Sequence, residues 1–120
     1  MSDNDTFETK EVNLQLMSKV KTSLRISQAS TSFDVEIEDL ILSCVEDLYI
    51  SGVIHIDVSK EIKDRLIIRA IVVYCKAHFG MSNPDTEKYV EIYDKMRIHL
   101  AMTRYRNPDP IEKVDAYVLE

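Results

Sequence analysis

Few residues in this sequence could do chemistry. Cys75 and His78 form a C-x-x-H pair, and three-residue spacing on a helix could begin a zinc site. A closed zinc site needs four ligands, and the other cysteine and histidine residues are Cys44, His55 and His99. The spacing of these three residues does not predict that they lie near Cys75 and His78. Cys75 also lies among apolar residues, where a thiol is a poor nucleophile. We therefore expect no catalytic residue, no metal and no cofactor.

Motifs that mark the common enzyme classes are also missing. The sequence contains no Walker loop, dinucleotide fingerprint, GxSxG elbow or HExxH motif. The carboxylates of residues 33–50 could bind divalent cations, but an acidic face toward solvent or another subunit explains them better. We interpret the chain as a protein that is not an enzyme, with a metal-assisted enzyme as a weaker alternative.

Composition indicates one small helical domain. The chain has 120 residues, of which 45% are hydrophobic and 30% charged, but only two are glycine. So few glycines cannot supply the tight turns of a β-sandwich or barrel. The net charge of −6 argues against a protein that grips duplex DNA through its phosphates. We expect no signal peptide and no membrane span, and a cytoplasmic setting in which both cysteines stay reduced.

Apolar residues at helical spacing predict an all-α fold, a small bundle of four helices. Asn83-Pro84-Asp85 supplies the N-cap and first turn of the last helix, whereas Asp57 or Ser59 is expected to cap the third. Residues 53–58 are expected to form either a short strand or a packed loop. The third helix is apolar around most of its circumference and should be central. The predicted helices cover about residues 13–24, 33–50, 60–79 and 84–103.

The second predicted helix has two apolar stripes. One contains Phe33, Ile37, Leu40, Ile41, Cys44 and Leu48. The other contains Val35, Leu42 and Tyr49, which are spaced by seven residues on the opposite side. A surface helix needs only one apolar face, so the second stripe indicates a second layer or a partner.

Charge is segregated among the predicted helices. The second carries six acids and no lysine or arginine, and the third carries five bases against two acids. Oppositely charged faces on one domain favour head-to-tail contacts between identical subunits, which close into rings or continue as filaments. The basic line on the third helix could instead be only its solvated edge. The predicted subunit interface contains Val35, Leu42, Tyr49, Glu38, Asp39, Glu46, Arg65, Arg69 and Lys76.

We divide the chain into a flexible polar N-terminus (1–11), a helical domain (12–106) and a C-terminal arm (107–120). The prolines of Asn107-Pro108-Asp109-Pro110 separate the arm from the domain. Apolar residues alternate in the arm, so it could add a strand to a partner's sheet. Its predicted partner-binding residues are Ile111, Val114, Ala116, Tyr117, Val118 and Leu119.

Four short runs of the sequence carry a family resemblance. They are Leu24-Arg25-Ile26-Ser27, Phe33-Asp34-x-Glu36-Ile37-x-Asp39-Leu40-Ile41, Ile68-Arg69-Ala70-Ile71-x-x-Tyr74-x-Lys76-Ala77-x-Phe79-Gly80 and Asn83-Pro84-Asp85-x-Glu87-Lys88. These runs resemble the head–tail connector proteins of long-tailed bacteriophages and prophages, also called adaptor, head-completion or DNA packaging proteins. The similarity extends over roughly residues 14–104, and its motifs contain no catalytic group. The chain departs from the plainest members in its polar start and its long tail.

The resemblance implies a virion protein made in the host cytoplasm. About twelve copies would form a ring below the portal, extend the DNA channel and join the capsid to the next neck or tail protein. It also implies that arms and termini grip the portal protein. Genomic DNA would pass through the channel without sequence-specific binding, and an acidic channel wall would keep it from sticking. A small helical bacterial DNA-binding regulator is the alternative function.

Overall fold

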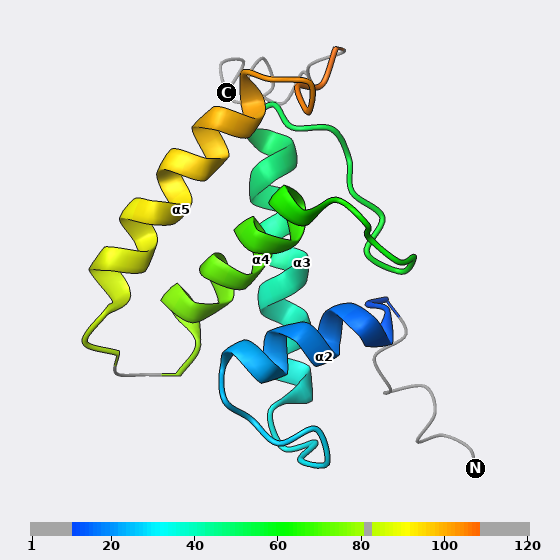
Figure 1. Cartoon of the computed structure of the whole chain (residues 1–120), viewed down its shortest axis with the longest axis vertical. Helices are drawn as coiled ribbons and strands as arrows, with labels where there is room; N and C mark the ends of the chain where they lie inside the picture. The colour runs from blue at the N-terminus through cyan, green and yellow to red at the C-terminus, as the bar shows by residue number, and fades with distance from the viewer. Residues whose placement is uncertain (1–10, 81–82, 109–120) are drawn as a thin grey trace, which may run out of the picture.

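The computed structural model describes residues 11–80 and 83–108, which form a small all-α bundle (Figure 1). Its elements are α2 (Leu14–Ser23), α3 (Asp34–Ile50), α4 (Arg65–His78) and α5 (Thr86–Ala101). Within these residues the only β-type pairing is an isolated antiparallel bridge between Val53 and Arg106. The predicted fold class is therefore confirmed. The polar start and most of the C-terminal arm, including all six of its predicted binding residues, lie outside the described residues.

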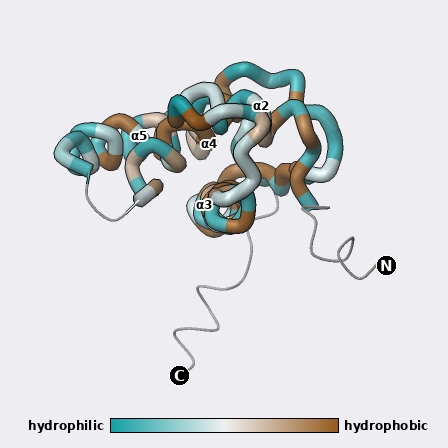
Figure 2. Tube along the Cα trace, turned by 90° about the horizontal axis from the view of Figure 1, so that it is seen from below, coloured by the Kyte–Doolittle hydropathy of each residue, from teal (hydrophilic) through white to brown (hydrophobic). Residues whose placement is uncertain are grey.

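Helix α4 is the centre of the bundle, as its apolar composition predicted. It contacts α2, α3 and α5. In Figure 2, α2, α4 and α5 lie side by side in one layer, and α3 packs beneath that layer. The outward sides of α4 and α3 therefore point away from each other.

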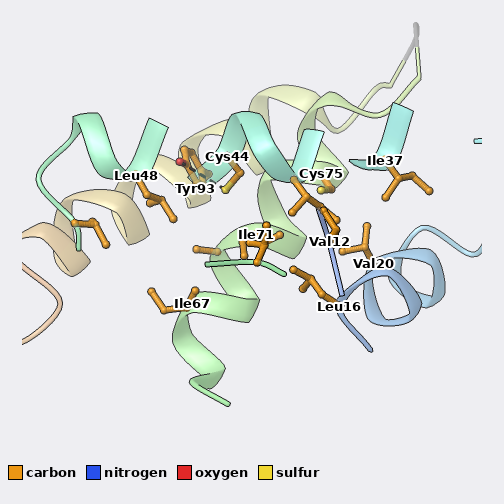
Figure 3. Close-up of a cluster of buried hydrophobic side chains, with 14 of the residues drawn as sticks. Val12, Leu16, Val20, Ile37, Cys44, Leu48, Ile67, Ile71, Cys75 and Tyr93 are labelled. Atoms are coloured by element: carbon orange, nitrogen blue, oxygen red, sulfur yellow. Dashed lines mark hydrogen bonds between the residues drawn. The ribbon is translucent and has the colours of Figure 1, made fainter. Parts of the chain in front are cut away.

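The core consists of aliphatic side chains, two thiols and two tyrosines contributed by all four helices and the adjoining loops (Figure 3). On α3 its members are Ile37, Ile41, Cys44 and Leu48, all of which belong to the predicted core stripe. Val12 precedes α2 and is buried as well, so the packed domain begins before its first described helix. Burying each of these aliphatic side chains is worth roughly 1.5–3 kcal/mol.

Asn13 ties the start of α2 to the loop that follows α3. Its Oδ1 accepts a hydrogen bond from the backbone N–H of Leu16 at 2.8 Å, which caps the helix. Its Nδ2 donates to the carbonyls of Val58 and Lys60, at 3.0 and 2.7 Å. One side chain thus connects two segments more than forty residues apart in sequence.

Two helices end in Schellman motifs. After α3, Gly52 has a φ of 108°, and the N–H of Val53 donates to the Leu48 carbonyl at 2.9 Å. The predicted end of the second helix at about residue 50 is therefore confirmed. After α2 the same position holds Arg25, with a φ of 64°, and the N–H of Ile26 donates to the Lys21 carbonyl at 2.9 Å. Glycine is usual there because a Cβ makes this conformation costly.

Two predicted helix starts were wrong. Helix α4 begins at Arg65, and its N-cap is Asp64, whose Oδ1 accepts from the Leu66 N–H at 3.1 Å. Asp57 instead closes a local turn with Ser59. Helix α5 begins at Thr86. The Asn83 Oδ1 accepts a hydrogen bond from the Asp85 N–H at 2.9 Å and so closes a short turn before the helix. The side chains of Asp57 and Asn83, which could each cap a helix, stabilise turns instead.

Residues 53–58 form a packed loop apart from the single bridge at Val53. Alternation along this segment would place Ile54, Ile56 and Val58 on one side, but Val53 and Val58 are buried and Ile54 is exposed. The alternation fails because the segment pairs with the chain after α5. The Ile54 N–H donates to the Tyr105 carbonyl at 2.8 Å, and the Asn107 N–H donates to the Gly52 carbonyl at 2.7 Å.

A search of the described residues for membrane spans found no helix with the length and apolar character that crossing a bilayer requires.

Candidate functional site

The cysteine and histidine residues do not gather into one site. Cys44 and Cys75 are buried free thiols, whereas His55, His78 and His99 are exposed. Among residues 11–80 and 83–108, no three histidine, cysteine, aspartate or glutamate side chains are grouped so as to hold a metal ion. Burial raises the pKa of Cys75 to about 12 and also raises that of Cys44. Both groups are therefore thiols at neutral pH and serve as small core side chains.

A polar junction that sequence reasoning missed joins α3 to α5. The Tyr93 hydroxyl donates to Asp47 Oδ2 at 2.7 Å, and the Cys44 thiol lies 3.9 Å from that hydroxyl. Arg97 reaches the same carboxylate, with its Nε 3.8 Å from Oδ2, and donates to the Ser51 hydroxyl at 3.1 Å. Cys44 and Asp47 lie three residues apart on α3, but this spacing does not identify their partners on α5.

Lys21 is a buried cation on α2. Its Nζ lies 3.0 Å from Asp34 Oδ1 and donates to the carbonyls of Ser30 and Gln28 at 2.5 and 3.3 Å. Its side chain is 6% exposed, so this ammonium belongs to the fold and is not available to a partner. It fixes the loop between α2 and α3.

Contacts within the domain involve some of the acidic side chains of α3. Of its six acids, Asp34 pairs with Lys21, and Asp47 bonds to Tyr93 and Arg97. Glu36 accepts a hydrogen bond from the Gly80 N–H at 3.1 Å and remains exposed. The other three acids are the ones in the predicted interface: Glu38, Asp39 and Glu46.

We call the six predicted interface residues of α3 the outer α3 face: Val35, Glu38, Asp39, Leu42, Glu46 and Tyr49. Their helical spacing places them opposite Ile37, Ile41, Cys44 and Leu48, which are buried. Val35 is 71% exposed, and Asp39 and Glu46 are exposed too.

The remaining members of the outer α3 face are half-buried. Leu42 packs partly against the core, and Tyr49 lies edge-on to His55 with ring centroids 5.7 Å apart. Burial, together with the nearby charges of Glu11 and Asp34, raises the pKa of Glu38. The outer α3 face is thus an apolar stripe with carboxylates along it.

The three predicted basic residues of α4 lie on one side of the helix, but their environments differ. Arg65 and Arg69 are exposed, and Arg65 lines a hollow with Lys63 and Arg104 at the start of the helix. Lys76 lies about 16 Å farther along the axis. Its Nζ is 5.4 Å from the ring centroid of Tyr89, so the cation is held against α5.

An apolar groove between α4 and α5 was not predicted. We call it the α4–α5 groove; it has a volume of about 200 Å³ and is lined by Leu66, Lys95, Met96, His99 and Leu100. Leu66 is 41% exposed although it belongs to an apolar helix. Its exposure follows from the true helix start at Arg65, which leaves Leu66 in the first turn. Correct placement of the N-cap at Asp64 would have revealed it.

The base of the C-terminal arm is held at the far end of α3. The Val53–Arg106 bridge and the Asn107–Gly52 hydrogen bond bring the chain after α5 against the residues that follow α3. The predicted binding residues Ile111, Val114, Ala116, Tyr117, Val118 and Leu119 lie outside the described residues.

A family model described as phage connector protein matches residues 16–107. This match covers α3, α4, α5 and all but the first two residues of α2, and it includes the outer α3 face and the α4–α5 groove. The chain belongs to the phage connector protein family. It is therefore a connector-type structural protein of a bacteriophage, as the resemblance in its sequence indicated. Comparison with curated proteins gave no match, and neither did comparison with solved structures.

Proposed function

We propose that this phage connector protein is a non-enzymatic part of the virion neck that assembles head-to-tail into a ring below the portal. Its family membership supports a role in joining virion parts. The observation that carries the ring is the arrangement of charge. The outer α3 face carries the exposed carboxylates of Asp39 and Glu46, whereas Arg65 and Arg69 are exposed on α4, which lies in the other layer of the domain (Figure 2).

Such an arrangement favours heterologous contact. Two copies related by a two-fold axis would place the same face against itself, so carboxylates would face carboxylates. When the acidic side of one copy meets the basic side of the next, the pair still has one free acidic face and one free basic face. Repetition then continues until the ring closes, with about twelve copies by resemblance to the connector family.

Some acidic residues would remain exposed after the subunits have bound one another. Such residues suit the wall of a DNA channel. DNA binding depends on cations that neutralise phosphates, and the net charge of the chain is −6. We infer that such a ring lets genomic DNA pass without gripping it or reading its sequence.

The C-terminal arm is proposed to contact the portal. Its base is anchored at Gly52, so residues 108–120 start from a fixed point beside the end of α3. Fully extended, these residues would reach roughly 45 Å, which is enough to cross to a neighbouring protein. The other end of the ring would receive the next neck or tail protein.

Binding to portal-bearing capsids tests this function. The full chain should attach to capsids, whereas a chain that ends at Asn107 should keep its helical circular dichroism spectrum but fail to attach. Equal attachment of both chains would disprove the role of the arm, and no attachment of the full chain would disprove the connector role. The alternative, a DNA-binding regulator, predicts salt-dependent retention on duplex DNA, which a connector should lack.

A further inference from the structure

The α4–α5 groove has the composition of a docking surface. Leu66 and Met96 line it, Leu100 is buried beneath them, and Lys95 lies at the edge with an exposed side chain. Arg69 is exposed and follows Leu66 by three residues, so it extends the basic edge along the same side of α4. The pairing of Lys95 with Glu91, at 3.7 Å, is exposed and worth little. The groove is therefore apolar at its floor and basic at its edge.

The outer α3 face has the complementary composition. Val35 and Leu42 are two helical turns apart and provide apolar anchors on one side of a regular helix. Asp39 and Glu46 are exposed beside them and provide negative charge at similar spacing. Helices with apolar anchors at this spacing dock into apolar grooves, and flanking charges set their orientation.

We propose that the α4–α5 groove of one copy receives the outer α3 face of the next copy, so that Leu42 lies against Leu66 and Met96. This inference rests on the proposed ring and identifies the two surfaces that build it. Because the outer α3 face lies on the side of α3 away from its buried residues, and the groove is lined only by residues of α4 and α5, the two surfaces share no residue and one copy can use both at once. Each end of the growing chain keeps one unpaired face until the ring closes.

Residues 111–119 of the arm are the other segment of this chain with an apolar and acidic composition. The outer α3 face is favoured because its anchors lie on a preformed helix, which loses little conformational entropy on docking. The charges of the groove also match both acids, Asp39 and Glu46.

Cysteine cross-linking between distinguishable copies tests the proposal. A Leu42→Cys chain with a long tag is mixed with an untagged Leu66→Cys chain, assembled with portal and oxidised. We expect a disulfide-linked pair of one tagged and one untagged chain, and its loss when either new cysteine is absent. Cys44 and Cys75 are buried and should not contribute. Gln15→Cys, exposed on α2 outside the groove, is the matched control and should give no product with Leu42→Cys. Val35→Cys replaces Leu42→Cys if the latter does not fold.

The outcomes separate the contact from the ring itself. Rings that contain the disulfide-linked pair of Leu42→Cys and Leu66→Cys chains support the proposal. A chain that carries both substitutions should then give a ladder of linked chains. Rings in which Leu42→Cys chains link to one another, or in which Leu66→Cys links to Val114→Cys, would overturn it. Failure of the wild-type chain to form rings would instead overturn the proposed function. Reversal of charge adds a second test: Glu46→Arg and Arg69→Glu should each lose assembly, and the two together should restore it.

Discussion

The hydroxyl of Tyr93 donates a hydrogen bond of 2.7 Å to the carboxylate of Asp47 and so joins the middle of α5 to the end of α3. The ring of Tyr93 also lies edge-on to Tyr74 of α4, with centroids 5.1 Å apart. Burial raises the pKa of the Tyr93 phenol far above its usual range, so the group is protonated and can donate at neutral pH. Three helices therefore meet at one side chain.

Replacement of Tyr93 by phenylalanine should lower the free energy of unfolding by about 1–2 kcal/mol. The ring contacts would remain, but Asp47 would lose its buried donor and keep only Arg97. Urea denaturation measures the change. Tyr89→Phe is the matched control, because its ring lies beside Lys76 and Lys88 and phenylalanine preserves that contact. Equal effects of the two variants would show that the Tyr93 hydrogen bond contributes nothing.

Lys21→Met should destabilise the fold by about 3 kcal/mol, since removal of one partner leaves Asp34 and two loop carbonyls without their cation. Methionine keeps most of the apolar stem. Lys19→Met, at an exposed position on the same helix, should change stability by less than about 0.5 kcal/mol. Thermal or urea unfolding measures both variants. A neutral Lys21→Met would mean that the ammonium is not needed to hold the loop.

Arg25 and Gly52 occupy equivalent positions after α2 and α3 and should respond in opposite directions. Arg25→Gly should stabilise the domain by about 1 kcal/mol, because glycine adopts the left-handed conformation without a steric penalty. Gly52→Ala should destabilise it by at least about 1 kcal/mol for the same reason. Paired urea titrations measure the two changes. Loss of stability in Arg25→Gly would reveal a contact of the arginine that outweighs its backbone cost.

Neither native thiol should react with a water-soluble disulfide reagent at about pH 8 while the protein is folded. Cys75 ionises only near pH 12, and Cys44 is also buried and has a raised pKa. Both should react within the mixing time in concentrated guanidinium chloride. Rapid labelling of the folded chain would contradict the burial of both groups and would require their replacement before any cross-linking experiment.

Much of the fold could be predicted from the sequence because the core stripes have strict helical spacing. Ile37, Ile41, Cys44 and Leu48 identified the buried side of α3 without any structure. The starts of α4 and α5 could not be predicted as well, because Asp57, Asp64 and Asn83 have side chains that can cap a helix or close a turn. Which of these occurs depends on tertiary contacts, such as those of Asn13 with Val58 and Lys60.

Partner surfaces were harder to predict than the core. Val35 is exposed and Leu42 packs partly against the core, and their spacing alone does not identify what covers that side of α3. Charge counts, however, could not show that Asp34 and Asp47 are used inside the domain, because Lys21 and Arg97 come from other helices. The α4–α5 groove depends on the packing of two helices separated by a loop, and no single stretch of sequence contains it.

Electron cryomicroscopy of portal-bearing capsids incubated with the full chain tests the central claim most directly. The account predicts a second ring of density below the portal, in which α3 of each subunit faces α4 and α5 of the next. Capsids without such a ring at saturating protein, or a ring in which α3 faces α3, would contradict it.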